Sequence, residues 1–268
     1  MQKLISFEIK ADFGMLKKPD TNEPVYLTFN MLHKPALLGI LGAIAGMKGF
    51  SRNGELPEYY QQLKSVKVGI KPLLKEDNSG RPYHENGNYT KTIIQYNNGT
   101  GMASEEAGGN LIIAEQTLIT PAFRCFVLLD DVLDEQKKLM ENLLSYKAEY
   151  IPYFGKNECS VWWENAEEVQ YYEFKPEDVF KINSLFIKEL PVKRIKVNEP
   201  LFDLSMDSPD GCTFCYFENL PVAYLGAPLF QYEYRNFAYT DWNLSIKKDK
   251  TGFLIQLQTD KNEIIQLF

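Results

Sequence analysis

The sequence of 268 residues predicts a mixed α+β fold. Its first part shows the order strand, helix, strand, strand, helix, strand, which is the order of a split βαβ, or ferredoxin-like, core. A long run of turn-forming residues interrupts this order, and short aromatic strand-like runs fill the rest of the chain. We therefore expect a ferredoxin-like domain over residues 1–155, with an arm inserted at 72–110, and a β-rich C-terminal part over 156–268.

The first strand is expected at about residues 3–10, and a helix is expected at 35–49. The bulky residues of this helix cover one side, and its glycines fall within an arc of about 80° on the other. These glycines are Gly39, Gly42, Gly46 and Gly49. Each interior glycine costs roughly 0.5–1 kcal/mol against alanine, so we expect close contact on the bare face.

The start of this helix is a candidate phosphate site. Pro35 suits a first helical turn and leaves unpaired backbone N–H groups beside His33 and Lys34. Such N–H groups attract anions, and two potential cations add to the attraction.

The remaining elements follow from periodicity and turn signals. Residues 72–110 are rich in turn formers around one strand at 91–96, and so much loop within a compact domain predicts a protruding arm. From about residue 160 aromatic residues crowd short strands, only 176–187 looks helical, and 253–268 forms a hairpin. The other elements of the first domain are a short helix near 56–63, a strand at 66–70, strands at 111–120 and 122–129, a helix at 132–145 and a last strand at 149–153.

Composition limits the class of protein. The net charge of −7 argues against a freestanding, non-specific nucleic-acid binder, but it allows a local basic groove or acidic faces that meet basic partners. No signal peptide precedes the first strand and the apolar helix is too short for a membrane, so we expect a cytoplasmic protein without membrane contact. Cys212 and Cys215 have zinc-knuckle spacing without a second close pair, which favours buried, reduced thiols.

Catalytic patterns are sparse. The chain has two histidines, His33 and His84, and no Ser/His/Asp or Cys/His arrangement, phosphate loop or metal-ligand spacing supports an enzyme, so we expect no metal and no cofactor. Metal-free RNA cleavage needs a general base and acid near a 2′-hydroxyl, a role that His33 and Lys34 could fill. We favour the alternative that both contact phosphate or lie at a solvated helix start.

A second candidate anion site is the run Gly155-Lys156-Asn157. Following an apolar stretch, it can present backbone N–H groups and one cation to an anion. The alternative is a β-turn with an exposed lysine, and the pattern alone leaves both open.

Taken together, these features resemble a known family. A Pro-x-x-x-Gly-x-x-Gly helix begins at Pro35, the run Ala114-Glu-Gln-Thr-Leu-Ile-Thr-Pro-Ala-Phe-Arg124 follows the arm, and Tyr153-Phe-Gly-Lys-Asn-Glu-Cys159 comes later. The chain resembles the CRISPR-associated protein family 5 in its type I-B form, within the repeat-associated RNA-binding (RAMP) superfamily. The resemblance covers the first 160 residues well and the aromatic C-terminal half only loosely.

This resemblance implies a non-catalytic subunit of Cascade, the complex that uses a CRISPR RNA (crRNA) guide in antiviral defence. Such a subunit caps the 5′ handle of the guide and contacts the backbone subunit and the large subunit, and through the latter the target DNA indirectly. The arm would be its thumb, in which Tyr83 and Tyr89 could stack on bases. The implied RNA-binding residues are Lys17, Lys18, His33, Lys34, Arg81, Tyr83, Lys91, Arg124, Gly155, Lys156 and Asn157.

One branch of the family, in type I-C systems, cleaves repeat RNA itself with Tyr, Lys and His. Counted back from Gly39 without gaps, the position of that tyrosine is Phe29, which lacks a hydroxyl. The adjacent Lys-His pair of that branch has no counterpart, because His33 and Lys34 stand elsewhere. In type I-B systems a separate endonuclease usually cuts the repeat. The alternative to a non-catalytic subunit is thus a metal-free endoribonuclease that processes CRISPR repeat RNA.

Overall fold

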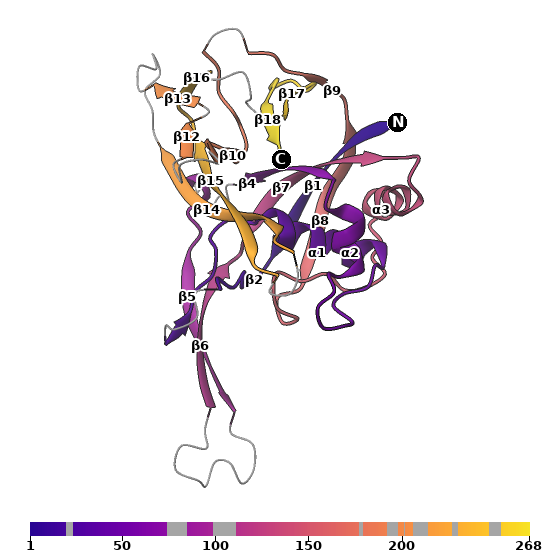
Figure 1. The fold of residues 1–268 in the computed structure, drawn as a ribbon, viewed down its shortest axis with the longest axis vertical. Helices are drawn as coiled ribbons and strands as arrows, with labels where there is room; N and C mark the ends of the chain where they lie inside the picture. Colours follow the sequence, from indigo (N-terminus) through magenta and orange to yellow (C-terminus); the bar gives the residue numbers. More distant parts are fainter. Residues whose placement is uncertain are drawn as a thin grey trace, which may run out of the picture.

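The computed structural model confirms a mixed α+β fold in which strands prevail (Figure 1). It is built around one central sheet, with helices on one face of that sheet and a long two-stranded arm projecting from its lower end. The described residues are 1–19, 24–73, 85–98, 111–176, 179–191, 198–200, 202–205, 214–226, 230–246 and 253–268.

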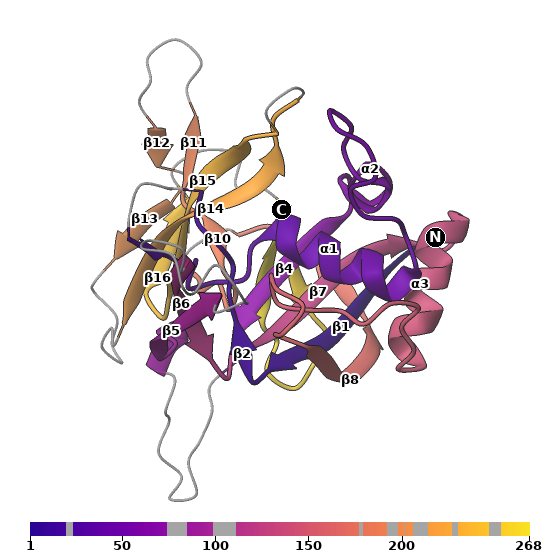
Figure 2. The ribbon, with the colours of Figure 1, turned by 90° about the horizontal axis from the view of Figure 1, so that it is seen from below.

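The central sheet has four antiparallel-paired strands among the described residues. Along the chain its elements alternate as strand, helix, strand, strand, helix, strand. Helix α1 (Lys34–Ala45) connects the first two strands and α3 (Asp134–Leu144) connects the last two, and both helices lie on the same face (Figure 2). In sheet order the strands are β4 (Lys67–Pro72), β7 (Ala122–Asp130), β1 (Gln2–Ala11) and β8 (Val161–Val169).

The strand expected at 149–153 is wrong, because the fourth strand of the sheet is β8. Residues 149 and 150 instead close the end of α1: the amides of Glu149 and Tyr150 donate to the carbonyls of Ile44 and Ala43 at 3.2 and 3.0 Å. The last carbonyls of a helix have no partner within it, so this segment satisfies them. The central sheet therefore continues past residue 155, where we had expected the first domain to end.

Helix α1 is shorter than the sequence suggested. His33 caps its start, Pro35 occupies its first turn, and Gly46 ends it in the left-handed conformation with φ +83°. Its leucines and isoleucines are buried against the sheet. On the opposite side α2 (Glu58–Leu63) packs so closely that a Cβ on Gly42 would collide with the Cβ of Tyr59. Close contact on the glycine face, as expected, is thus confirmed at Gly42.

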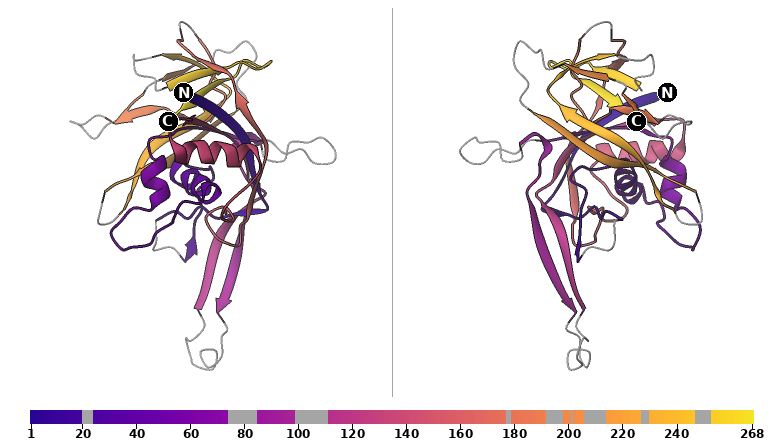
Figure 3. Two further views of the ribbon diagram at one scale, coloured as in Figure 1. Left: turned by 90° about the vertical axis from the view of Figure 1, so that its right-hand side faces the viewer. Right: turned by 60° about the vertical axis from the view of Figure 1, so that its left-hand side comes forward.

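The arm is an antiparallel ribbon that extends away from the body (Figures 1 and 3). Its described strands are β5 (Lys91–Asn98) and β6 (Leu111–Ile119), preceded by the short 3-10 helix η1 (Glu85–Gly87). At its base β6 also pairs with β2 (Phe13–Gly14) and β3 (Val25–Tyr26). Of the arm expected at 72–110, residues 74–84 and 99–110 lie outside the described residues.

The C-terminal part packs small sheets against the body. The terminal hairpin of β17 (Phe253–Leu257) and β18 (Ile264–Leu267) is confirmed, and with β9 (Tyr171–Glu173) it covers part of the outer face of the central sheet. A long hairpin of β14 (Cys215–Tyr224) and β15 (Tyr232–Thr240) crosses toward α1, beside β10 (Phe186–Ile187). The remaining pairs are β11 (Glu189–Pro191) with β12 (Asn198–Pro200) and β13 (Phe202–Ser205) with β16 (Asn243–Ile246).

The helix expected at 176–187 is wrong over its described residues. Phe180 forms a bridge to Leu244, and β10 pairs with β15. Phe180, Ile182 and Phe186 are buried in one cluster with Leu244, so their spacing of two and four suits an extended chain. Within the described ranges, no helix is both long and apolar enough to cross a membrane.

The packing at Gly42 predicts a stability difference between two neighbouring glycines. Gly42→Ala forces a Cβ onto Tyr59, which costs about 1–3 kcal/mol, whereas a Cβ at Gly39 would lie 3.8 Å from the Tyr59 ring in ordinary contact. We expect Gly39→Ala to melt at or above the temperature of the wild-type protein and Gly42→Ala to melt below it. Thermal unfolding followed by circular dichroism measures both, and equal melting temperatures would contradict the packing at Gly42.

Candidate functional site

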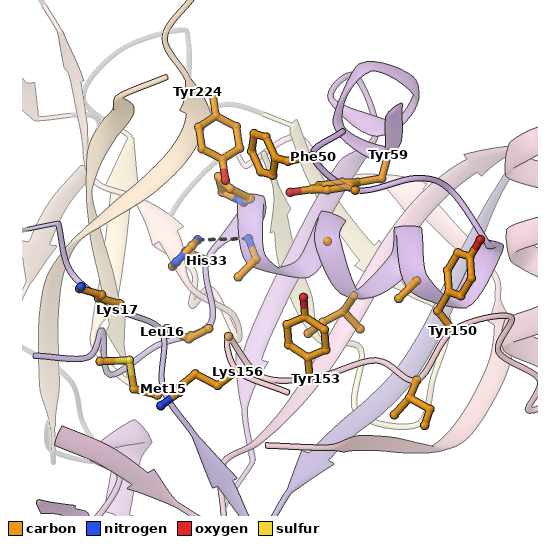
Figure 4. Close-up of a pocket in the computed structure, with 18 of the residues that line it drawn as sticks. Met15, Leu16, Lys17, His33, Phe50, Tyr59, Tyr150, Tyr153, Lys156 and Tyr224 are labelled. Carbon is orange, nitrogen blue, oxygen red and sulfur yellow. Dashed lines mark hydrogen bonds between the residues drawn. The ribbon is translucent and has the colours of Figure 1, made fainter. Parts of the chain in front are cut away.

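A cavity of about 680 Å³ lies along the glycine face of α1 (Figure 4). Small residues of the helix, Ala36, Gly39 and Ala43, form its floor. Aromatic side chains stand on both sides of the helix, with Tyr59 on one side and Tyr153 on the other. Its volume falls within the range of about 300–1,000 Å³ that is typical of small-ligand sites.

One wall comes from α2 and the tip of the β14–β15 hairpin. The rings of Tyr224 and Tyr232 stack at 5.0 Å and an interplanar angle of 25°, and Tyr60 meets Tyr224 edge-on at 4.9 Å. The hydroxyl of Tyr60 accepts the amide of Tyr224 at 2.8 Å, which ties the hairpin to α2. Burial raises the pKa of Tyr59 and of Tyr224 to about 12, so both remain neutral phenols at physiological pH.

The opposite wall comes from the segment between α3 and β8. Tyr150, Ile151 and Tyr153 line the cavity and are 55%, 77% and 44% exposed. Phe50, on the first wall, is 59% exposed. Large apolar side chains that remain this exposed around a cavity are typical of a surface that binds a partner or ligand.

One end of the cavity carries two lysines together with Glu115. Lys17 and Lys156 lie there (Figure 4). The Nζ atom of Lys156 donates to Glu115 at 2.6 Å and lies 4.3 Å above the Tyr96 ring, so this end adjoins the root of the arm. Burial alone lowers the pKa of Lys156, but the hydrogen bond and charge of Glu115 outweigh it and raise that pKa.

The Gly155-Lys156-Asn157 run forms the turn that positions this lysine. Gly155 has φ +82°, and a Cβ on it would collide with the carbonyl oxygen of Met15, so only glycine fits. The amide of Cys159 donates to the carbonyl of Lys156 at 2.9 Å and closes the turn. Asn157 is exposed and does not line the cavity. The structure thus brings Gly155 and Lys156 to the cavity.

His33 lines the cavity but serves as the cap of α1. Its Nδ1 accepts the amide of Ala36 at 3.3 Å, and burial lowers its pKa to about 3. The ring is therefore neutral at physiological pH, with its hydrogen on Nε2, and it lies edge-on to Phe29 and Tyr232. The expectation of a cationic phosphate contact at His33 is corrected accordingly.

Lys34 does not reach the cavity. Its side chain is buried, and its Nζ donates to the carbonyl oxygen of Phe268 at 3.1 Å. Burial and the neighbouring charge of Lys67 lower its pKa to about 8. The phosphate contact expected at Lys34 is therefore not part of this cavity, and His33 and Lys34 are engaged with different partners, the Ala36 amide and the Phe268 carbonyl.

Two further residues differ from expectation because each already has a partner. Arg124 lies on the central sheet, where it pairs with Glu8 at 2.9 Å, and it does not line the cavity. Tyr89, expected to stack on bases, is buried against Phe123, and its hydroxyl donates to the carbonyl of Ala122. Burial raises the pKa of Tyr89.

Lys18 and Lys91 line a separate, polar cavity of about 420 Å³ at the base of the arm. Lys18 lies 3.7 Å from Glu218, and Lys91 donates to Asn30 at 2.7 Å. Burial lowers the pKa of Lys91. Arg81 and Tyr83 lie outside the described residues, as do His84 and Cys212.

Sequence reasoning missed the aromatic walls. They come from the segment before α2, α2 itself, the segment before β8 and the β14–β15 hairpin, which are far apart in the chain. The sequence signals for the cavity were the bare face of α1, whose glycines predicted close contact, and the Gly155-Lys156-Asn157 run. Among the described residues, no group of three or more His, Cys, Asp or Glu is arranged to hold a metal ion.

Comparisons with known proteins give structural neighbours only. No family model matches the sequence, and no curated protein matches it. A CRISPR protein from Archaeoglobus fulgidus shares 13% identity over 99% of this chain and 98% of that chain, with a TM-score of 0.49. A chain of a CRISPR RNA-guided surveillance complex shares 11% identity over 90% and 91%, with a TM-score of 0.43.

A chain of the type III-B Cmr-beta complex bound to cognate target RNA and AMPPnP shares 8% identity over 91% of this chain and 86% of that chain, with a TM-score of 0.45. The names of the first two include CRISPR, and the third is a chain of a type III-B Cmr-beta complex. At these identities and TM-scores they assign neither a family nor a function to this chain.

The burial of His33 predicts a pH dependence of stability. A folded-state pKa of about 3 lies below the unfolded value of about 6.5, so the unfolded state binds the proton first and stability falls as the pH drops below 6.5. Between pH 7 and pH 5 this site alone removes roughly 2 kcal/mol. Urea unfolding at both pH values measures it. His33→Asn keeps a capping oxygen without a titrating ring, so an equal pH dependence in that variant would refute the assignment.

Proposed function

We propose that this protein is a non-catalytic RNA-binding subunit of a type I-B CRISPR effector complex, and that it holds the 5′ handle of the guide RNA along the glycine face of α1. The observation that carries the proposal is the cavity, with aromatic walls on two sides and lysines at the end nearest the arm. The sequence resemblance to CRISPR-associated protein family 5 supports it independently.

The chemistry of the cavity suits single-stranded RNA. Unstacked bases can lie on the rings of Tyr59 and Tyr153, while Lys17 and Lys156 neutralise phosphate. A net charge of −7 means that attraction to RNA is local to such sites rather than spread over the surface. This combination favours one specific RNA segment over non-specific coating of nucleic acid.

The fold supports the same proposal. The sheet order β4-β7-β1-β8, with both crossover helices on one face, supports the assignment of a ferredoxin-like domain. The β5–β6 ribbon then corresponds to the thumb, inserted between the second and third strands of that domain.

The exposed apolar residues of the arm favour contact with partner subunits. Ile93 and Ile112 on it are 57% and 63% exposed, and an isolated two-stranded ribbon is only marginally stable in water. We infer that the arm contacts the backbone subunit, that the body meets the large subunit, and that target DNA is reached only through them. A complex of this kind acts in antiviral defence in the cytoplasm.

RNA binding tests the proposal directly. Fluorescence anisotropy with a labelled single-stranded CRISPR repeat RNA from the source genome measures the affinity of the purified protein. We expect Lys17→Ala to weaken binding roughly tenfold, the equivalent of about 1.4 kcal/mol for one charged contact, and Lys156→Gln to weaken it less, because Glu115 already pairs with that lysine. Lys17→Ala should also lower the slope of log affinity against log salt by about 0.7.

The matched control is Lys137→Ala, which removes an exposed lysine of α3 that does not line the cavity. It should bind like the wild-type protein. Wild-type protein that does not bind the repeat RNA, or an equal loss in all three variants, would contradict the assigned site.

Absence of cleavage tests the non-catalytic part of the proposal. The proposal is supported by the present partners of both side chains, since the Nδ1 lone pair of His33 accepts the Ala36 amide and the Nζ atom of Lys34 donates to the Phe268 carbonyl. We expect labelled repeat RNA to stay intact in EDTA when incubated with the protein. A specific cut that disappears in His33→Ala would instead establish the metal-free endoribonuclease.

A further inference from the structure

The glycines along α1 do not all have the same structural role. Gly42 makes room for Tyr59, and Gly46 supplies the left-handed end of the helix. At Gly39 the atoms nearest to a Cβ would be those of the Tyr59 side chain at 3.8–3.9 Å, which is ordinary van der Waals contact. Alanine would fit there and would favour the helix by about 1 kcal/mol. Packing within the described chain therefore does not explain Gly39.

Gly39 lies in the floor of the cavity, between Ala36 and Ala43. These residues are one helical turn apart, so their positions make a flat strip of backbone with almost no side chain above it. Tyr59 and Tyr153 stand on opposite sides of this strip (Figure 4). Any Cβ or larger group at position 39 would occupy space in the cavity rather than space filled by protein.

We propose, on the basis of the RNA-binding function proposed above, that one base of the bound RNA turns out of the strand and inserts over Gly39. Its flat face lies against the backbone of α1, its edges meet the aromatic walls, and its phosphate lies toward Lys17 and Lys156. Gly39 is the residue that determines whether a planar ring can enter.

The character of the cavity selects a nucleobase among possible occupants. A planar ring matches a flat floor between aromatic side chains, and base–aromatic stacking contributes about 1–3 kcal/mol per base. An aliphatic side chain from a partner would gain nothing from the lysine end. A nucleotide uses both features, because its base is planar and its phosphate is anionic.

An abasic scan tests the insertion. A series of labelled repeat RNAs, each lacking one base, is titrated against the wild-type protein and against Gly39→Leu by anisotropy. With the wild-type protein, we expect the removal of one particular base to weaken binding at least about fivefold. Gly39→Leu should bind the intact RNA with the same reduced affinity. Removing that base from the RNA should not weaken the binding of this variant further.

The outcomes separate this inference from the function on which it rests. If both proteins bind intact RNA equally and share one abasic profile, insertion over Gly39 is wrong while RNA binding stands. If the wild-type protein binds no repeat RNA, both the proposed RNA-binding function and the insertion over Gly39 are wrong. If Gly39→Leu leaves the RNA profile unchanged but blocks association with a co-expressed backbone subunit, the cavity holds a protein side chain and the inference is overturned.

Two further variants keep the test independent of folding. Gly39→Ala introduces a single methyl group without a clash and should give an intermediate loss at the same base. Tyr153→Ala removes a wall residue that is 44% exposed, so it changes the cavity without disturbing a core. It should weaken binding at that base and at no other, and a uniform loss along the RNA would contradict the insertion.

Discussion

The two-sided packing of α1 is the constraint on which the rest of the structure depends. One side of the helix is filled with leucine and isoleucine and buried against the central sheet, which fixes its position. The other side is bare, so α2 approaches until the Cβ of Tyr59 occupies the space above Gly42. The segment before β8 then reaches the end of the helix through the amides of Glu149 and Tyr150. Because α2 and this segment stand on opposite sides of the bare strip, a cavity with a backbone floor remains between them.

Elements that depend on local pattern were predictable. The helices α1 and α3, the strands β6 and β7 and the terminal hairpin follow from periodicity and turn residues within a short window. The fourth strand of the sheet was not, because Val161–Val169 mixes tryptophans with glutamates and contains a register shift where it pairs with β1. Its place depends on pairing with residues of β1 that lie 150 or more positions earlier in the chain. The helix expected around Phe180 to Phe186 was wrong for the same reason, since the residues that these side chains pack against lie in β15 and at Leu244.

The candidate site shows the same division. Gly155 and Lys156 were recognisable because a turn with a glycine and a cation is a local signal. Lys34 and Arg124 looked equivalent in sequence, but each is held by a distant acceptor, Phe268 or Glu8. A basic residue in a sequence indicates that its side chain can bind an anion. Only the folded structure shows whether that side chain already has a partner within the protein. The aromatic walls could not be predicted, because they meet in space from segments that share no local pattern.

Electrostatics and stacking do not contribute equally at this site. Lys156 is paired with Glu115, which is 8% exposed and also lines the cavity, so an incoming phosphate competes with that carboxylate for the lysine. The net gain from that lysine is therefore smaller than from a free cation. Stacking on the aromatic walls requires no ion pair to be broken, although Tyr224 and Tyr232 already stack on each other. If the protein binds RNA as proposed, recognition depends mainly on bases that are free to leave a stack, which a duplex does not offer and a single-stranded handle does. Under the same proposal, an acidic protein selects one short RNA segment without a basic surface.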